Sequence, residues 1–316
     1  MLQHEPKEKP MRESLAPGVW GVVPTPFQGS TLDVDTDSLA LLAEHYQSIG
    51  ATGLTVLGVF GEAAALTAAE RNLVLETVVE ETELPLVVGV TSLYTGTAVD
   101  EIRAAQAAVG DRLAAVMVQA NSARPEVVIA HLNAIHQSTG AKVVLQDYPL
   151  ASGVSISTES LIYIVQACAF VVAVKAEAPP TSAAIAQLTD AVEVSVFGGL
   201  GGQGLLDELI AGAAGAMTGF SYPEALVACV RAWQADGYDA AKDELLPYLP
   251  LINFEQQAKI ALAIRKECFR ERNLIKDAGV RPPAASFPDA LRKNMLTHLG
   301  EAALALNSST SLQGWL

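Results

Sequence analysis

The feature that most constrains the fold of this sequence is a regular alternation of short apolar, β-branched runs with longer amphipathic segments. The amphipathic segments have helical periodicity, as at residues 36–50 and 66–82. Parallel β/α units produce such an alternation, and eight of them over this length predict a (β/α)8 TIM barrel. The predicted strands are residues 20–27, 53–59, 84–90, 112–120, 142–149, 170–176, 193–199 and 215–220.

The alternation ends after the eighth unit. The sequence that follows contains only helical patterns, so we predict a barrel over residues 17–236 and a C-terminal helical extension over residues 237–306. The charged segment 1–16 and the polar segment 307–316 are expected to be mobile tails. The alternative fold is a doubly wound open sheet. It is disfavoured because no G-x-G-x-x-G motif follows the first strand.

The composition of the chain limits which molecules it is expected to bind and where it is expected to be located. The chain has 316 residues, of which 50% are hydrophobic, and a formal net charge of −15. Such an acidic protein is not expected to bind nucleic acid or an anionic membrane surface. No apolar run is as long as a membrane span, and the first residues lack the apolar core of a secretory signal. The three scattered cysteines indicate a reducing compartment, so we predict a cytoplasmic protein.

Metal and cofactor chemistry find no support in the sequence. The five histidines are scattered, and the spacing of His131 and His136 does not place them on one face of a helix. No H-E-x-x-H motif or carboxylate-rich loop occurs. The glycine-rich segment 198–202 lacks the spacing of a phosphate-binding loop, and we interpret it as a tight turn that makes room for substrate. We therefore predict no metal site and no cofactor.

Lys175 is the single cation in the apolar run 170–176. A run of this kind is typical of a strand buried on both faces, where a bare ammonium group is costly. Burial lowers the pKa of a lysine and makes its neutral amine available as a nucleophile. The position therefore suits Schiff-base chemistry with a carbonyl substrate. The alternative is a structural lysine whose amine reaches the barrel rim.

Barrel enzymes carry their catalytic residues at the carboxyl-terminal ends of the strands. In this sequence those ends carry polar, aromatic and glycine residues, which form the candidate site. They include Thr25, Val59, Phe60, Gly61, Asn121, Ser122, Gln146, Asp147, Tyr148, Lys175, Glu177, Gly199 and Gly201.

With these residues in place, the chain resembles the dihydrodipicolinate synthase / N-acetylneuraminate lyase family. The matching motifs, besides the strand lysine, are G-V-V-P-T-P-F at 21–27, G-x-x-G-E at 58–62, V-G-V-T at 88–91 and V-R-P-P at 280–283. The resemblance spans residues 17–300. It implies a (β/α)8 barrel with C-terminal helices, usually a homotetramer, whose lysine joins a 2-keto acid such as pyruvate as a Schiff base. That role falls to Lys175.

The chain departs from this family in the loop that holds the keto-acid carboxylate. Family members carry threonines where this sequence has Val59 and Phe60. The hydroxyl groups are therefore lost, and the backbone N–H groups around Val59, Phe60 and Gly61 are left to bind the carboxylate. We predict these residues, with Thr25 and the glycines at 199 and 201, as the substrate-binding set.

The residues that carry protons in the family are also replaced. The aligned position of the strand-five tyrosine is Gln146, and Tyr148 lies two residues later on the same face of the strand. For Tyr148 a packing role is favoured over a catalytic one. The family tyrosine after strand four gives way to the region around Asn121. The arginine that binds aspartate semialdehyde in the synthase would fall at Ala151, so the synthase reaction lacks its carboxylate clamp.

Some other group must then move protons around the imine. Glu177 shares a face with Lys175 if the strand continues, and it is the candidate base at C3 of the imine. An ion pair without catalytic function is the alternative. Asp147 and Tyr148 are further candidates, with Gln146 beside them. The Q-D-x-P and K-x-E-x-P patterns at 146–149 and 175–179 resemble a 2-keto-3-deoxy sugar acid dehydratase branch of the family.

We therefore predict a cofactor-free lyase that forms a lysine Schiff base with a small-molecule 2-keto acid. Dehydration of a 2-keto-3-deoxy sugar acid is favoured. Aldol cleavage that releases pyruvate comes second, and 4-hydroxy-tetrahydrodipicolinate synthase comes third because position 151 is alanine. The alternative is that the protein is not an enzyme but a barrel that binds a keto acid without converting it.

Overall fold

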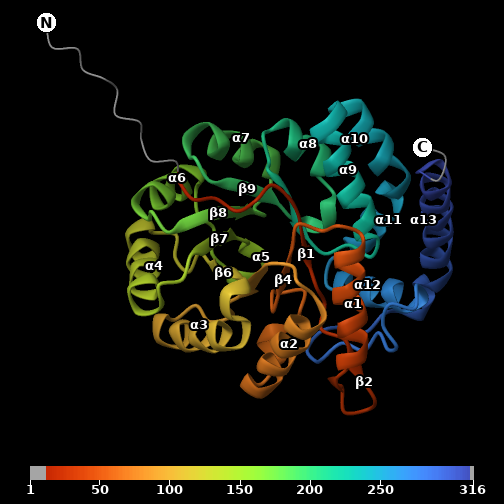
Figure 1. Cartoon of the computed structure of the whole chain (residues 1–316), viewed down its shortest axis with the longest axis horizontal. Helices are drawn as coiled ribbons and strands as arrows, with labels where there is room; N and C mark the ends of the chain where they lie inside the picture. The colour runs from red at the N-terminus through yellow and green to blue at the C-terminus, as the bar shows by residue number, and fades with distance from the viewer. Residues whose placement is uncertain (1–11, 314–316) are drawn as a thin grey trace, which may run out of the picture.

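The structure is a computed structural model that describes residues 12–313. Its centre is a closed barrel of eight parallel strands (Figure 1). The last of these strands, β10, pairs with the first, β1. Each strand overlaps one of the predicted runs, so the (β/α)8 barrel is confirmed. In barrel order the strands are β1 (Gly18–Val22), β4 (Gly53–Val56), β5 (Leu86–Gly89), β6 (Leu113–Gln119), β7 (Val143–Asp147), β8 (Val171–Ala176), β9 (Ser195–Gly198) and β10 (Gly215–Thr218).

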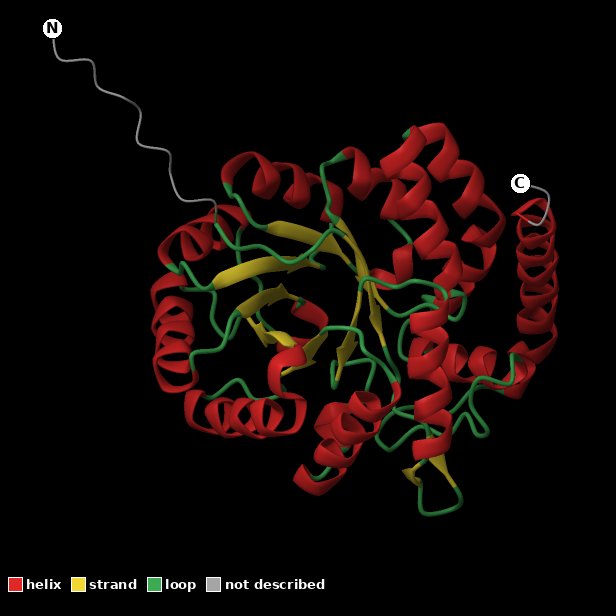
Figure 2. Ribbon diagram, in the orientation of Figure 1, coloured by secondary structure: helices red, strands yellow, loops and turns green. Residues whose placement is uncertain are grey.

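Helices form a ring around these strands, as Figure 2 shows. The helices that follow the strands are α1 (Thr36–Ser48), α2 (Ala68–Glu81), α3 (Thr95–Val109), α4 (Pro125–Thr139), α6 (Thr158–Ala167), α7 (Thr181–Ala191), α8 (Leu205–Ile210) and α9 (Pro223–Asp236). The C-terminal extension consists of α10 (Tyr238–Leu245), α11 (Leu249–Glu255), α12 (Ala261–Glu271) and α13 (Arg292–Gln313). Three short elements lie between these strands and helices: β2 (Phe27–Gln28), β3 (Asp33–Val34) and α5 (Pro149–Ser152). None of the helices within residues 12–313 is long and apolar enough to cross a lipid bilayer.

Local sequence signals set several helix ends. Asp35 caps α1 by accepting a hydrogen bond from the N–H of Ser38 at 3.2 Å. Thr67 and Glu70 form a reciprocal capping box at the start of α2. Gly140 follows α4 with a φ of 68°, a left-handed conformation that glycine adopts without steric cost. The two N-caps fix where the loops after β1 and β4 end, and Gly140 begins the connection from α4 to β7 at the opposite end of the barrel.

The period of two along each strand separates the barrel interior from the helix-facing side. On β8, Val174 and Ala176 pack among the apolar residues that face the helices. Ala173 belongs to the cluster inside the barrel, with Met117 and Phe197. Lys175, two residues after Ala173, therefore points into the barrel. The apolar run predicted from the sequence is buried on both faces, and its lysine lies on the inner one.

The N-terminal segment closes the other end of the barrel. The N–H of Leu15 donates to the carbonyl of Val172 at 3.2 Å, and the hydroxyl of Ser195 donates to the carbonyl of Leu15 at 2.6 Å. The side chain of Leu15 packs in the interior cluster. Residues 12–16 are thus part of the barrel floor and not of a tail, because an apolar side chain at this point covers otherwise exposed core. Residues 1–11 of the predicted tail lie outside the described residues.

The predicted C-terminal tail also needs correction. Helix α13 continues to Gln313, seven residues beyond the predicted end of the extension at residue 306. The serines and threonines in this stretch lower helix propensity by only fractions of a kcal/mol each, so they do not end the helix. Residues 314–316 lie outside the described residues.

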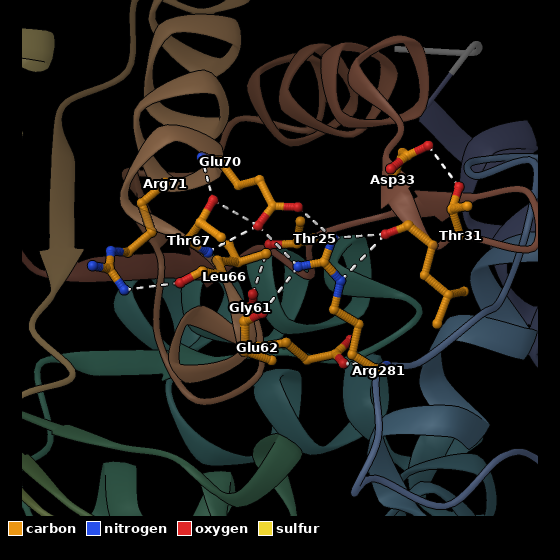
Figure 3. Close-up of polar contacts among 12 residues, drawn as sticks. Thr25, Thr31, Asp33, Gly61, Glu62, Leu66, Thr67, Glu70, Arg71 and Arg281 are labelled. Atoms are coloured by element: carbon orange, nitrogen blue, oxygen red, sulfur yellow. Dashed lines mark hydrogen bonds and ion pairs between the residues drawn. The ribbon is translucent and has the colours of Figure 1, made fainter.

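A polar network ties the C-terminal segment to the loop after β4 (Figure 3). The buried ammonium group of Lys266 on α12 contacts the carboxylate of Glu62 and donates to the carbonyl of Gly279 at 2.8 Å. The backbone N–H of Arg281 donates to the other oxygen of Glu62 at 2.8 Å. The guanidinium of Arg281 contacts both carboxylate oxygens of Glu70. Leaving one partner of a buried pair of this kind alone costs about 3–5 kcal/mol, so the extension is needed to hold the loop.

Replacing Glu70 by glutamine is expected to destabilise the protein in a pH-dependent manner. Glutamine keeps the capping box but removes the charge opposite Arg281, so we expect the free energy of unfolding near pH 7 to fall by about 1–2 kcal/mol. The hydrogen bond from Arg281 lowers the pKa of Glu70 to about 2 from its ordinary 4.5. This stabilisation is therefore present above about pH 4.5 and lost as the pH falls through 2.

Urea denaturation of the wild type and the Glu70→Gln variant at pH 7 and pH 3 measures the effect. The difference between the two proteins should be smaller at pH 3. Glu76→Gln is the matched control, because Glu76 is an exposed carboxylate on the same helix, and it should change stability by less than about 0.5 kcal/mol. An equal loss in both variants at both pH values would show that the Arg281 contact contributes nothing specific.

Candidate active site

A cavity of about 270 Å³ lies at the carboxyl-terminal ends of the strands, where barrel enzymes carry out their chemistry. The structure brings most of the predicted site residues to its wall. Those that line the cavity are Val59, Phe60, Gln146, Tyr148, Lys175, Glu177 and Gly201. Within the described chain, six of the predicted residues do not line it: Thr25, Gly61, Asn121, Ser122, Asp147 and Gly199.

Lys175 lies at the centre of this arrangement. It is paired in register with Gln146 on β7 and Phe197 on β9, so all three side chains point into the barrel. Only 5% of Lys175 is exposed to solvent. Its ammonium nitrogen lies 3.3 Å from Oε2 of Glu177. The amine is thus both buried and paired with one carboxylate.

Glu177 is held in place from two sides. Its N–H donates to the carbonyl of Asp147 at 2.9 Å, which continues the pairing of β7 and β8 by one residue beyond the strand. The carboxylate oxygen that faces Lys175 also accepts a hydrogen bond from Nε2 of Gln146 at 2.7 Å. An amide in place of the family tyrosine therefore positions the carboxylate next to the lysine.

The glycines after β9 make room for two carboxylates. A Cβ atom on Gly199 would collide with the carboxylate of Glu177, and one on Gly198 would collide with that of Glu208 on α8. The glycine-rich turn was interpreted from the sequence as space for substrate. At residues 198 and 199 the structure fills that space with protein side chains, whereas Gly201 does border the cavity.

Glu208 is a second buried acid behind this turn. It is 1% exposed and accepts a hydrogen bond from the hydroxyl of Thr181 at 2.7 Å. Burial, opposed by the hydrogen bond from Thr181 and assisted by the negative charge of Glu177, raises the pKa of Glu208 from its ordinary 4.5 to about 7. Glu208 therefore gains or loses its proton near neutral pH.

Tyr148 and Asp147, which the sequence left as alternative proton carriers, point in opposite directions. Tyr148 lines the cavity with Lys175, and burial followed by the charge of Glu177 raises the pKa of its phenol. Asp147 alternates with Gln146 along β7 and faces the helices. It is paired in register with Ala176, which belongs to the outer core. Burial raises the pKa of Asp147 to about 6. Tyr148 thus borders the cavity, and the packing role favoured from the sequence stays a prediction beside the catalytic one.

Two residues predicted to bind substrate, Gly61 in the loop after β4 and Thr25 in the segment after β1, are used within the protein instead. The N–H of Gly61 donates to the carbonyl of Gly58 at 3.0 Å, so it is used within the turn. The hydroxyl of Thr25 donates to the carbonyl of Gly61 at 2.6 Å and ties the loop to the segment between β1 and β2 (Figure 3). At most the N–H groups of Val59 and Phe60 remain for a carboxylate. The ring of Phe60 packs directly over Gly219, where a Cβ atom would collide with it.

Gly201 and Gly199, also predicted to bind substrate, contact protein groups instead. The N–H of Gly201 donates to the hydroxyl of Thr218 at 2.8 Å, so it is not free for a ligand. Gly199 is occupied by its contact with Glu177. The binding set predicted from the sequence thus consists largely of residues that shape the cavity.

The residues that sequence reasoning missed come from the C-terminal extension. Gln256, Lys259 and Arg265 line the same cavity as Lys175. They lie in or next to α11 and α12, some eighty residues after the strand lysine. The sequence there is an amphipathic helix with several cations, and nothing in its local pattern marks Arg265 apart from its neighbours. Only the packing of the extension over the barrel mouth reveals it.

A second cavity of about 490 Å³ adjoins the first. The two share Gly58, Val59, Met117, Gln146 and Leu262 in their walls. Ala151, the position at which the synthase arginine would fall, lines the second cavity, and so does Arg281. The guanidinium of Arg281 is already bound to Glu70 and to the carbonyl of Leu32. The second cavity therefore has volume but no uncommitted cation at these positions.

Two histidines of α4, His131 and His136, make contacts within the protein. His131 bonds through Nδ1 to the hydroxyl of Thr95 at 2.8 Å, and burial lowers its pKa. His136 stacks on the ring of Phe170 at a centroid distance of 4.1 Å. Within residues 12–313, no three His, Cys, Asp or Glu side chains gather in a way that would hold a metal ion.

Comparison with known proteins places the chain among enzymes of one family. A profile of the dihydrodipicolinate synthetase family matches residues 16–302, which confirms the resemblance seen in the sequence. The chain is similar to L-2-keto-3-deoxyarabonate dehydratase from Azospirillum brasilense, with 29% identity over 291 residues, 88% of this chain and 92% of that protein. It is 30% identical over 153 residues to 4-hydroxy-tetrahydrodipicolinate synthase from Porphyromonas gingivalis, 48% of this chain and 51% of that one. The crystal structure of dihydrodipicolinate synthase from Rhodopseudomonas palustris matches with a TM-score of 0.84 at 29% identity, over 92% of this chain and 100% of that one.

Replacing Glu208 by glutamine should change how stability depends on pH. The pKa of Glu208 in the folded protein is raised to about 7, so its contribution to stability is full below about pH 4.5 and is lost as the pH rises through 7. Over this window the wild type should lose up to about 3 kcal/mol that the Glu208→Gln variant retains. Chemical denaturation at pH 5 and pH 8 measures the stability of both proteins.

The variant should gain stability relative to the wild type between these two pH values. Glutamine can still accept the hydrogen bond from Thr181, so the comparison isolates the charge. Glu193→Gln, an exposed carboxylate just before β9, is the control and should show no such gain. A constant difference between the wild type and Glu208→Gln across the range would contradict the raised pKa.

Proposed function

The chain belongs to the dihydrodipicolinate synthetase family, whose members are lyases, and we propose that it dehydrates a 2-keto-3-deoxy sugar acid through an imine on Lys175. The observation that carries this proposal is the buried contact of 3.3 Å between the amine of Lys175 and the carboxylate of Glu177. It unites a nucleophile for the ketone with a base for the carbon next to it.

In the proposed reaction, Lys175 acts first and Glu177 second. The amine of Lys175 attacks C2 of the keto acid, and the oxygen of the ketone leaves as water to give an iminium ion. The carboxylate of Glu177 then takes a proton from C3, which gives an enamine. The enamine expels the C4 hydroxyl group, which takes up a proton and leaves as water. Hydrolysis of the resulting conjugated imine frees Lys175.

Tyr148 is the proposed donor of the proton to the leaving hydroxyl. Its side chain lines the cavity with Lys175 and Glu177, whereas Asp147 faces the helices. Asp147 is therefore not assigned a role in proton transfer. Gln146 is assigned a positioning role, because its amide holds the oxygen of Glu177 that faces the lysine.

Two observations favour a sugar acid over aspartate semialdehyde as substrate. The second cavity, of about 490 Å³, adjoins the lysine cavity and has room for a hydroxylated chain. Ala151 lines it, and Arg281 beside it is committed to Glu70, so the carboxylate clamp of the synthase reaction is missing. Similarity to the named dehydratase over 88% of this chain supports the same choice.

The predicted cytoplasmic location and homotetramer stay predictions. Cys168, Cys229 and Cys268 are buried and free, and this state fits a reducing compartment. Analytical ultracentrifugation would measure the oligomeric state directly.

Borohydride trapping tests the imine. After incubation with pyruvate or with a panel of 2-keto-3-deoxy sugar acids, reduction should leave a covalent adduct on Lys175, located by peptide mass spectrometry. The Lys175→Ala variant should lose the adduct and all turnover while retaining the fold. Lys142→Ala removes an exposed lysine near the barrel floor and should be trapped like the wild type.

The trapping site also separates the alternatives. Lys259 is another lysine on the cavity wall, and an adduct there in place of Lys175 would contradict the assignment. Thermal stabilisation by keto acids with no adduct and no turnover would favour a barrel that only binds its ligand.

Replacing Glu177 by glutamine should separate imine formation from the later steps. Glutamine is nearly isosteric and can still accept the hydrogen bond from Gln146, but it cannot remove the proton from C3. We expect the variant to be trapped by borohydride while kcat for dehydration falls by about 100- to 10,000-fold. Steady-state kinetics with the substrate found by the panel measures the loss, and a kcat within threefold of the wild type would exclude Glu177 as the base.

A further inference from the structure

A guanidinium group from the C-terminal extension reaches the cavity of the proposed nucleophile. Arg265 on α12 lines the cavity with Lys175 and Tyr148, and only 11% of its side chain is exposed. Its guanidinium carbon lies 5.4 Å from the centroid of the Phe60 ring, in the loop after β4. The cation therefore borders the part of the cavity where the family resemblance predicts that the keto-acid carboxylate binds.

Two nitrogen atoms of this guanidinium lack hydrogen-bond partners among residues 12–313. Among the described residues, neither Nε nor Nη2 of Arg265 has a hydrogen-bond partner, although both atoms are buried. Nε forms an ion pair with Glu255 at 3.4 Å, beyond good hydrogen-bond length. Glu255 itself accepts hydrogen bonds from the N–H and the hydroxyl of Ser221. A buried guanidinium in this state is costly unless a ligand supplies acceptors.

The proposed substrate offers one group that meets this need. A 2-keto-3-deoxy sugar acid has a single anionic group, its carboxylate, and arginine binds carboxylates with paired hydrogen bonds. The loop that should hold this carboxylate has lost its hydroxyl groups at Val59 and Phe60, and it uses the N–H of Gly61 internally. With a net charge of −15, the chain needs a local cation to attract an anion.

We propose that Arg265 binds the carboxylate of the 2-keto acid and replaces the hydroxyl groups that this chain lacks. This inference rests on the proposed function, because it takes the imine at Lys175 as the position of the substrate. A carboxylate held by Arg265 aligns C2 of the substrate with the amine. The extension thus contributes a residue that selects 2-keto acids over neutral ketones.

The competing explanation is that Arg265 serves only as the counter-ion of Glu255, which is completely buried. In that case its removal would lower stability, but it would not change which ketones react with Lys175. The two explanations therefore differ in selectivity and not in stability. A pair of ketones that differ only in charge can separate them.

The test compares pyruvate with pyruvamide, its neutral and nearly isosteric amide, in borohydride trapping. The ratio of trapping rates is measured for the wild type and for Arg265→Gln, Arg265→Lys and Arg270→Gln. Differences in intrinsic ketone reactivity cancel when this ratio is compared between variants. Arg270 lies on the same helix and is bound to Glu267 at 2.8 Å, so its variant controls for the loss of one positive charge.

We expect Arg265→Gln to lose about 10- to 100-fold of the preference for pyruvate. Arg265→Lys should retain an intermediate preference, and Arg270→Gln should match the wild type. Thermal melts establish that each variant is folded, and Arg265→Lys keeps the test valid if glutamine next to Glu255 prevents folding. An unchanged ratio in folded Arg265→Gln or Arg265→Lys would overturn the inference and leave Arg265 as the counter-ion of Glu255.

A second measurement distinguishes this failure from failure of the proposed function. If the wild type gives no adduct with either ketone, the imine is wrong, and binding is then tested without it. In the Lys175→Ala background, pyruvate should raise the melting temperature more than pyruvamide does, and adding Arg265→Gln should abolish the difference. Equal shifts by both compounds would overturn carboxylate binding at Arg265 independently of the imine.

Discussion

The buried contact between Lys175 and Glu177 is the interaction on which the rest of the site depends. It exists because the pairing of β7 and β8 continues one residue beyond the strand, through the N–H of Glu177 and the carbonyl of Asp147. Residues two apart then share the inner face of the barrel. The carboxylate also needs the space that a side chain at Gly199 would fill. The pairing of β7 with β8, the alternation of side chains along β8 and the small size of Gly199 therefore place the carboxylate next to the amine.

The alternation of side chains along strands also explains how far the sequence could predict the site. The barrel and the buried strand that carries Lys175 follow from local apolar patterns, which the sequence states directly. Once Gln146 faces Lys175, alternation along β7 turns Asp147 toward the helices and Tyr148 toward the cavity. The sequence left these two residues as alternatives, because a period of two fixes relative direction but not which face is inside.

Features that depend on distant packing could not be read from the sequence. The segment 12–16 looks like a charged tail until Leu15 is seen against the barrel floor. Thr25 and Gly61 look like ligand contacts until their hydrogen bond to each other is seen. Arg265 lies far from the strand ends in sequence, and its role depends on how α12 packs over the barrel mouth. Local periodicity carries no information on such contacts.

The position of α12 joins stability and binding in two consecutive residues. Lys266 points away from the cavity and holds Glu62 of the loop after β4, in a pair that Arg281 completes. Arg265, one residue earlier, lines the cavity and lies against Phe60 of the same loop. Successive residues on a helix point about 100° apart, so one helix can fasten a loop with one cation and present the next to a ligand. The extension therefore fixes the geometry of the β4 loop and supplies charge to the cavity that this loop encloses. The chain is acidic, and valine and phenylalanine replace the hydroxyl groups that would bind the carboxylate. Without Arg265, the described cations that line the Lys175 cavity would be Lys175 and the exposed Lys259.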